Sequence, residues 1–362
     1  MSWVIIVTER NVWPPQHGCD ARICRLAAGI QSLGYKVLLL GSTHSRIQQA
    51  EGHVGDAVSA INAPLWDWAA AKGGLDHFDA GWYSGAIHDI CCRSDVSAVI
   101  AEYLWMAPAL NIVPDGILKV VDTHDVMHKR AAIYDAHGVN PWIRVSRERE
   151  AELLSIADAV LAIQDEEASE LRVMLPTKRV LTVGHWVGDM TAKVSPGNHR
   201  ISIVGSDNHS NIYAVGEFLK IWNQVKDAEL HLWGTVCGHV PDIHGVIKHG
   251  FVDDLLEAYE IADVVVNPTV VGTGLKIKTV EAMCSGKCVI TTFCGAEGIY
   301  GGVYGCELQQ MPRAIEMLLN NSDSRRQWER AAFAYAERHF AFEAVFGEFG
   351  KLIEGFPKDL PE

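Results

Sequence analysis

The chain has 362 residues, of which 48% are hydrophobic and 21% are charged, and its formal net charge is -14 with an isoelectric point near 5.6. This length predicts two domains, because a single hydrophobic core rarely grows beyond about 250–300 residues. The acidic balance excludes nucleic-acid binding through bulk charge, which requires a basic surface.

The first residues, MSWVIIVT, predict a buried strand and not a signal peptide, because they lack a basic start and a small-residue cleavage site. No run of about eighteen apolar residues occurs, so we expect no membrane-spanning helix. The nine cysteines lack the paired spacing of a zinc site and are expected to be reduced thiols of a cytoplasmic protein.

Short runs rich in valine and isoleucine alternate with helix-length segments along both halves of the chain. Continuous apolar runs are typical of strands that are buried on both faces of a parallel sheet. A helix is predicted over residues 20–33, with Gly34 as its stop signal. The alternation predicts an α/β architecture with open parallel sheets. The expected strands are residues 3–8, 36–41, 98–102, 119–123, 159–164, 179–183, 201–205, 229–234, 246–252, 263–267 and 287–292.

The alternating pattern lapses after residue 184, where Gly188, Pro196 and Gly197 predict a linker before a new strand begins. We therefore expect two similar α/β domains with a cleft between them. Their predicted bounds are residues 1–190 and 198–340. A C-terminal helical segment, residues 341–362, could pack back on the first domain.

The motif VGTGLKIKTVEAM, late in the chain, combines a glycine turn with charged residues at the start of a helix. Gly272 and Gly274 let a ligand approach the backbone, and the first amides of the helix attract an anion. Lys276 adds a positive charge, while Glu281 could accept hydrogen bonds from the hydroxyls of a ribose. The motif thus predicts a diphosphate site, the alternative being a plain turn with solvated lysines. It is neither a Walker loop nor a GxGxxG fingerprint.

This motif resembles the donor-site signature of retaining glycosyltransferases with the GT-B fold, from family four (group 1 glycosyl transferases). The resemblance also includes VGSDNHSNIYAVGEFL, GFVDDLLEAYEIADVVVNP and KCVITTFCGAEGI, and so covers nearly all of the second half. It implies two Rossmann-like domains, of which the first faces the acceptor and the second binds a nucleotide-diphosphate sugar. It further implies a hexosyltransferase-type enzyme that transfers a sugar, with retention, to a glycan, a lipid-linked acceptor or a small molecule.

The resemblance also implies roles for individual residues. In the family, two glutamates eight positions apart contact the sugar and the ribose; Glu281 matches the second, whereas Thr273 takes the place of the first. A family histidine that faces the donor sugar matches His124 in KVVDTHDVMHKR, although His124 could instead merely pack. The catalytic residues implied are His124, Lys276 and Glu281. The donor-binding residues implied are Gly18, Gly205, Gly250, Gly272, Thr273, Gly274, Lys276 and Glu281.

No metal is expected, because no DxD triad and no metal-like spacing of His, Asp and Glu occurs, and no cofactor is expected besides the donor itself. A basic stretch could form a solvated helix face or touch a membrane or a lipid-diphosphate acceptor. We therefore expect a cytoplasmic protein, with the inner face of the membrane as the alternative location. The basic stretch comprises Lys129, Arg130, Arg144, Arg147 and Arg149, with Trp142 among them.

Two other functions are compatible with these residues. One is a sugar-nucleotide epimerase or a phosphorylase on the same fold, of which the epimerase would act on the donor without an acceptor. The other is a sugar-nucleotide-binding protein that has lost catalysis, which the threonine at position 273 makes conceivable.

Overall fold

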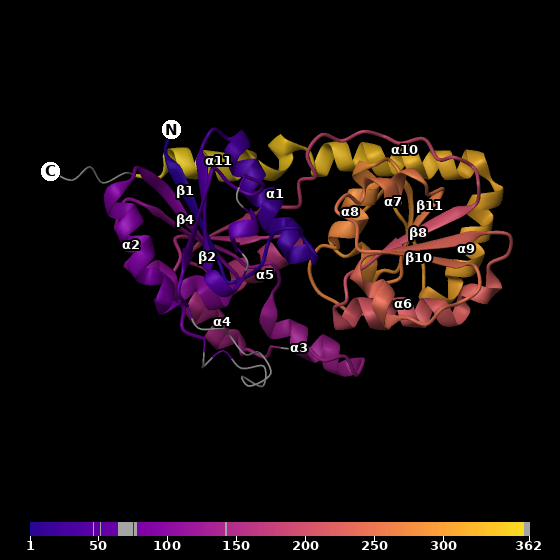
Figure 1. The fold of residues 1–362 in the computed structure, drawn as a ribbon, viewed down its shortest axis with the longest axis horizontal. Coiled ribbons are helices and arrows are strands. Elements are labelled where there is room, and N and C mark those ends of the chain that lie inside the picture. Colours follow the sequence, from indigo (N-terminus) through magenta and orange to yellow (C-terminus); the bar gives the residue numbers. More distant parts are fainter. Residues whose placement is uncertain (46, 51, 64–74, 76–77, 142, 358–362) are drawn as a thin grey trace.

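The computed structural model describes residues 1–45, 47–50, 52–63, 75, 78–141 and 143–357. Figure 1 shows two α/β domains side by side, with the last two long helices running along one side of both. The expected α/β class and its two parallel sheets are confirmed.

The first domain contains a seven-stranded sheet in the order β3-β2-β1-β4-β5-β6-β7, in which every pair is parallel. Its strands are β1 (Trp3–Thr8), β2 (Lys36–Ser42), β3 (Ala57–Ile61), β4 (Val96–Glu102), β5 (Leu118–Asp122), β6 (Ala159–Ala162) and β7 (Arg179–Thr182). Its helices are α1 (Gly18–Ser32), α2 (Ser84–Arg93), α3 (Met127–Ala136), α4 (Arg147–Leu154) and α5 (Asp165–Met174). The sequence prediction missed β3, an edge strand whose residues are all half-buried and form no continuous apolar run.

The second domain contains a six-stranded parallel sheet in the order β10-β9-β8-β11-β12-β13. Its strands are β8 (Arg200–Val204), β9 (Glu229–Trp233), β10 (Val246–Gly250), β11 (Val264–Asn267), β12 (Cys288–Thr291) and the two-residue β13 (Tyr304–Gly305). Its helices are α6 (His209–Ile221), α7 (Leu256–Glu260), α8 (Ile277–Cys284), α9 (Met311–Asn320) and α10 (Ser322–His339), and the chain then continues into α11 (Phe342–Gly355). The sequence prediction missed β13, because two residues carry no periodicity.

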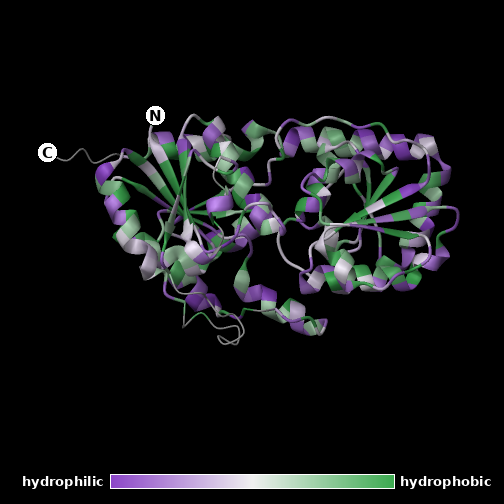
Figure 2. Ribbon diagram, in the orientation of Figure 1, coloured by the Kyte–Doolittle hydropathy of each residue, from purple (hydrophilic) through white to green (hydrophobic). Residues whose placement is uncertain are grey.

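The inner strands are buried because helices cover both faces of each sheet, whereas the edge strands β3 and β10 are partly exposed; Figure 2 shows hydrophobic residues concentrated on the strands. In such sheets, ligands bind beyond the carboxyl ends of the strands. Residues that directly follow strands of both sheets border one shared space, among them Tyr103, Gly205, Gly234 and Phe251. The two sheets therefore direct their strand ends toward the same cleft.

The C-terminal helix α11 packs on the first domain, although the chain reaches it after the second. Phe346 and Phe349 share a core cluster with Val4 and Ile30. A Cβ atom on Gly29 of α1 would lie 2.0 Å from the ring of Phe346, so only glycine permits this contact. The ring of Phe346 thus occupies the space that a side chain at position 29 of α1 would otherwise fill.

We expect Phe346→Ala to lower the free energy of unfolding by about 3–5 kcal/mol, because it leaves a cavity in a fully packed core. Urea denaturation followed by circular dichroism measures this. The matched control is Phe293→Ala, whose side chain is 64% exposed and should change stability by less than about 0.5 kcal/mol. Equal transitions for the two variants would contradict the packing role of α11.

Candidate functional site

A cavity of about 1080 Å³ lies between the two domains. Its size suits a nucleotide-sized ligand. The predicted residues that line it are Gly18, His124, Gly205, Gly272, Thr273, Gly274, Lys276 and Glu281. Gly250 does not line it; its carbonyl accepts a hydrogen bond from the amide of Gly234 at 2.7 Å, and the residues that follow it reach the cavity instead.

The predicted glycine turn contacts the opposite domain. Gly274 has a φ of 75°, a left-handed conformation that favours glycine. A Cβ atom at this position would lie 2.8 Å from Oδ1 of Asp125 and 3.1 Å from the carbonyl oxygen of His124. Glycine is therefore required both for the turn and for the close approach of the second domain to the first.

The two lysines of the motif have different partners. Lys276 precedes α8 and is buried; its Nζ donates to the carbonyl of Gly274 at 2.6 Å and to Oε2 of Glu297 at 3.2 Å. Lys278 lies on α8, and its Nζ donates to Oδ1 of Asn211 at 2.7 Å. Burial, and to a smaller degree the charge of Lys276, lower the pKa of Lys278 to about 7. Lys276 thus stabilises the loop through hydrogen bonds within it. Lys278, which the sequence analysis did not name as a site residue, is a second lysine that lines the cavity.

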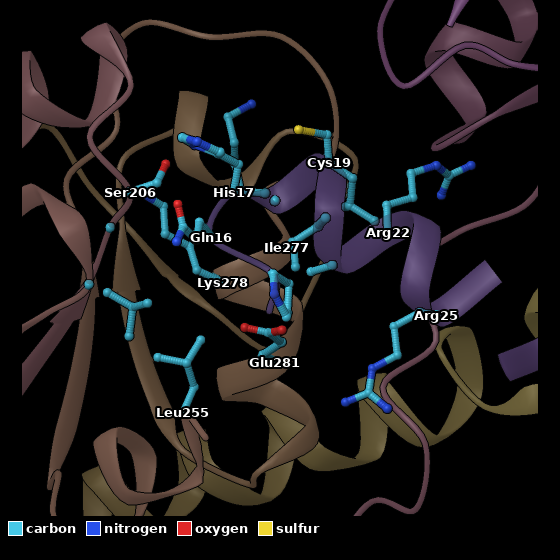
Figure 3. A pocket seen from close by; sticks show the side chains of 18 of the residues that line it. Gln16, His17, Cys19, Arg22, Arg25, Ser206, Leu255, Ile277, Lys278 and Glu281 are labelled. Atoms are coloured by element: carbon cyan, nitrogen blue, oxygen red, sulfur yellow. The ribbon is translucent and has the colours of Figure 1, made fainter. Parts of the chain in front are cut away.

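The environment of Lys278 is suited to an anion. The amide nitrogen of Asn211 donates to Oγ of Ser206 at 3.1 Å, and Asn208 caps the start of α6 by accepting from the backbone amide of Asn211. The positive end of this helix dipole faces the same cavity. Figure 3 shows Ser206 and Lys278 from the second domain near Gln16 and His17 from the first. The KxK pattern of the motif points to both lysines, but the pattern alone does not reveal which of them forms hydrogen bonds within the loop.

Glu281 lies one turn into α8 with its carboxylate at the cavity wall (Figure 3). Its Oε2 accepts a hydrogen bond from the hydroxyl of Tyr259 at 2.9 Å. Its Oε1 lies 3.8 Å from Nε2 of His185, a buried histidine of the interdomain linker. One carboxylate oxygen is therefore oriented by the protein, while the other remains available to a ligand hydroxyl.

His124 follows β5 and has a φ of 61°, which is uncommon for a residue with a side chain. Its Nε2 lies 2.7 Å from Oε2 of Glu102, and its ring stacks on Tyr103 with centroids 4.0 Å apart. Burial lowers the pKa of His124 to about 3, so the imidazole is neutral at physiological pH. The ring is thus a neutral hydrogen-bonding group at the cavity wall.

Behind His124, ligand-type atoms of Glu102, Asp122 and His124 lie within 4.8 Å of one another. This cluster was not visible as a spacing in the sequence, because its members come from two strands. Arg22 already occupies Asp122 with hydrogen bonds of 2.6 and 2.7 Å. Asp122 is therefore already paired with a cation, and Nε2 of His124 with Oε2 of Glu102. Metal independence stays a prediction, and activity in the presence of EDTA tests it.

The basic stretch that suggested membrane contact is engaged with carboxylates. Arg144 bonds Asp135, and Arg149 bonds Glu152. Lys129 and Arg147 both approach Glu170, and Arg130 pairs with Asp125. Trp142 lies outside the described residues. Within the part of the chain that the structure describes, no helix is long and apolar enough to cross a membrane.

Comparison with known proteins agrees with this architecture. Residues 198–321 match the family model described as glycosyl transferases group 1. No curated protein matches the chain. The second domain therefore resembles the group 1 glycosyltransferases, as its motifs indicated, and the chain as a whole has the GT-B fold.

Several solved structures share the fold at low sequence identity. Sucrose-phosphate synthase from Thermosynechococcus elongatus has a TM-score of 0.75 at 13% identity, over 98% of both chains. HepE of Anabaena in complex with UDP and glucose has a TM-score of 0.70 at 12% identity, over 98% of this chain and 100% of that one. TarM of S. aureus, in a complex that includes UDP, has a TM-score of 0.60 at 14% identity, over 76% and 58% of the two chains.

We expect Gly274→Ala to separate the domains, because its methyl group would collide with Asp125 and strain the left-handed backbone. The radius of gyration from small-angle X-ray scattering should rise, and the melting temperature should fall. Gly216→Ala is the matched control, since nothing lies within 4 Å of its Cβ position. A Gly274→Ala variant as compact as the wild type would show that this contact does not hold the domains together.

Proposed function

We propose that the protein is a glycosyltransferase that moves a sugar from a nucleotide-diphosphate sugar to an acceptor. The observation that carries this proposal is the meeting of Lys278 and Glu281 of one domain with His124 of the other in a single cavity. The family model that matches the second domain and the solved structures of similar fold support it, since HepE of Anabaena has been solved in complex with UDP-glucose.

In this proposal, the second domain holds the nucleotide. The diphosphate lies against the Gly272–Gly274 turn, the start of α6 and Lys278, while Lys276 holds the turn in place and adds positive charge from beneath. Glu281 accepts hydrogen bonds from the ribose. These groups stabilise the charge that develops on the leaving diphosphate, which is electrostatic catalysis without a covalent intermediate.

The first domain supplies the wall that faces the sugar and the acceptor. His124 orients the donor sugar at the end of β5. The acceptor, a glycan, a lipid-linked molecule or a small molecule, enters along the first-domain side, which also presents Trp13, Tyr103 and Tyr134. Transfer with retention is part of the proposal, and the anomeric configuration of the product, read by NMR, decides it.

A non-catalytic sugar-nucleotide-binding protein is the second candidate, and Thr273 favours it. The family's first glutamate is absent there, and Oγ1 of Thr273 is buried without a hydrogen-bond partner among the described residues. Incubation with a panel of sugar nucleotides separates the candidates. Hydrolysis or transfer supports the transferase, an isomerised donor supports an epimerase, and binding without turnover supports the binding protein.

We expect His124→Ala and Glu281→Ala to fail in different ways, because they belong to opposite walls. His124→Ala should lower turnover by about 100-fold or more, through a contact made in the transition state, and leave UDP affinity nearly intact. Glu281→Ala should first lose UDP affinity, by roughly 1.5–3 kcal/mol for a charge-assisted hydrogen bond. Calorimetry and initial rates measure both.

Melting temperatures provide the control for this pair. A histidine that merely packs would lower the melting temperature, and activity would fall only as the protein unfolds. If His124→Ala keeps wild-type turnover, the proposed role is wrong, and His17 becomes the next candidate.

We expect UDP affinity to fall as pH rises above about 7. The pKa of Lys278 is lowered to about 7, so the amine is charged below this pH and becomes neutral above it. A bound diphosphate favours the charged amine, and binding above neutrality should therefore take up a proton. Calorimetry in buffers of different ionisation enthalpy measures this uptake. Lys278→Arg should abolish it, because arginine stays charged, and identical proton uptake in both proteins would remove Lys278 from the site.

A further inference from the structure

Two carboxylates face each other behind His124. Glu102 ends β4 and Asp122 ends β5, and the two residues are register partners in the parallel sheet. Both are completely buried. Arg22 forms two hydrogen bonds to Asp122 and none to Glu102, so this guanidinium pairs with only one of the two carboxyl groups. Two adjacent buried carboxylates with a single counter-charge cannot both ionise cheaply.

Of the two carboxyl groups, that of Glu102 has the environment of a protonated acid. Its Oε1 is buried and has no hydrogen-bond partner within the described ranges. An ionised oxygen in that position would be far more costly than the carbonyl oxygen of a neutral acid. Burial first, and then the nearby charge of Asp122, raise the pKa of Glu102 well above its ordinary value. The other oxygen, Oε2, lies 2.7 Å from Nε2 of His124.

The imidazole cannot easily turn away from this contact. His124 and its neighbour Tyr103 both have positive φ values, of 61° and 70°, and Tyr103 combines its φ with a ψ of 155°. Such conformations persist only where the surroundings hold them. The amide of Tyr103 donates to the carbonyl of Asp122 at 2.8 Å, and the rings of His124, Tyr103 and Trp105 form a continuous stack.

The second ring nitrogen of His124 has a different environment. Nδ1 forms no hydrogen bond with any residue that the structure describes, and it is not among the fully enclosed polar atoms without a partner. His124 itself lines the interdomain cavity. With Nε2 turned inward to Glu102, Nδ1 is the nitrogen that remains for a ligand.

We propose that Glu102 is a positioning residue that donates its proton in a hydrogen bond to Nε2 of His124, so that the Nδ1–H of His124 faces the cavity as a donor. The group that meets His124 is then an oxygen that accepts a hydrogen bond, such as a sugar hydroxyl. This ligand assignment rests on the proposed function, whereas the state of the imidazole does not. An ionised Glu102 would produce the opposite tautomer, with a bare Nδ1.

The tautomer can be measured without any substrate. Histidine is labelled with ¹⁵N, and the ring signals of His124 are identified by their loss in His124→Gln. The wild type should show a protonated Nδ1 and an unprotonated Nε2. Glu102→Gln should keep this pattern, since an amide N–H can replace the acid as donor, and Glu102→Leu should lose it. A wild-type His124 protonated on Nε2 alone would overturn the proposal.

Kinetics provide the second readout. With a donor that the wild type turns over, Glu102→Leu should lower kcat by about 10- to 100-fold, and Glu102→Gln should stay within about threefold. Affinity for UDP should change in neither variant, because the nucleotide is held by the other domain. Equal loss of kcat in both variants would contradict the positioning role. If no donor is turned over, the proposed function fails, and the NMR result still decides the tautomer.

Glu150 provides a matched control. It is also a completely buried acid of the first domain, but it accepts hydrogen bonds from the amides of Met127 and His128 at the start of α3. Glu150→Gln should leave the ring signals of His124 unchanged. If it shifts them as strongly as Glu102→Leu does, the effect is a general response of the domain, and the proposal is wrong. Melting temperatures identify any variant that does not fold.

Discussion

A single buried arginine joins the part of the first domain that carries His124 to the interdomain linker. Arg22 of α1 forms two hydrogen bonds to Asp122 at the end of β5, and it also donates to the carbonyls of Val183 and Gly184, where the linker begins. Removing one partner of such a buried pair typically costs about 3–5 kcal/mol, because the other charge remains without compensation. The position of His124, two residues after Asp122, and the path of the linker therefore depend on the same side chain.

The second domain packs against this part of the first domain through contacts that require glycine. Gly274 lies directly against the backbone carbonyl of His124 and the side chain of Asp125, and Gly298 lies against the side chain of Gln164. On another side, Tyr134 and Val139 of the first domain enclose Val271 of the second. The Gly272–Gly274 turn is thus held between two parts of the first domain, which places Lys276 and His124 at the same cavity before a ligand enters. Preorganisation of this kind reduces the entropy lost when the reacting groups are brought together.

The polar groups of the cavity show a division between bracing and binding. Three side chains donate hydrogen bonds to neighbouring protein groups and so fix their positions, namely those of Lys276, Tyr259 and Arg22. Lys278 and Glu281 keep part of their capacity toward the cavity. A site built in this way holds charged groups in place in a region of low dielectric, where they act more strongly on a ligand than they would in water.

The sequence by itself determined the fold class and most of the strands, because continuous apolar runs leave little choice other than a buried parallel sheet. It also located the glycine turn and Glu281, since both follow from local patterns within one strand, turn and helix. It could not reveal β3, whose half-buried residues carry no such run, or the different partners of Lys276 and Lys278. The pairing of Glu102 with His124 was equally hidden. These features depend on residues that lie far apart in the sequence, and only the tertiary structure decides which side chains meet, which are buried and which protons they keep.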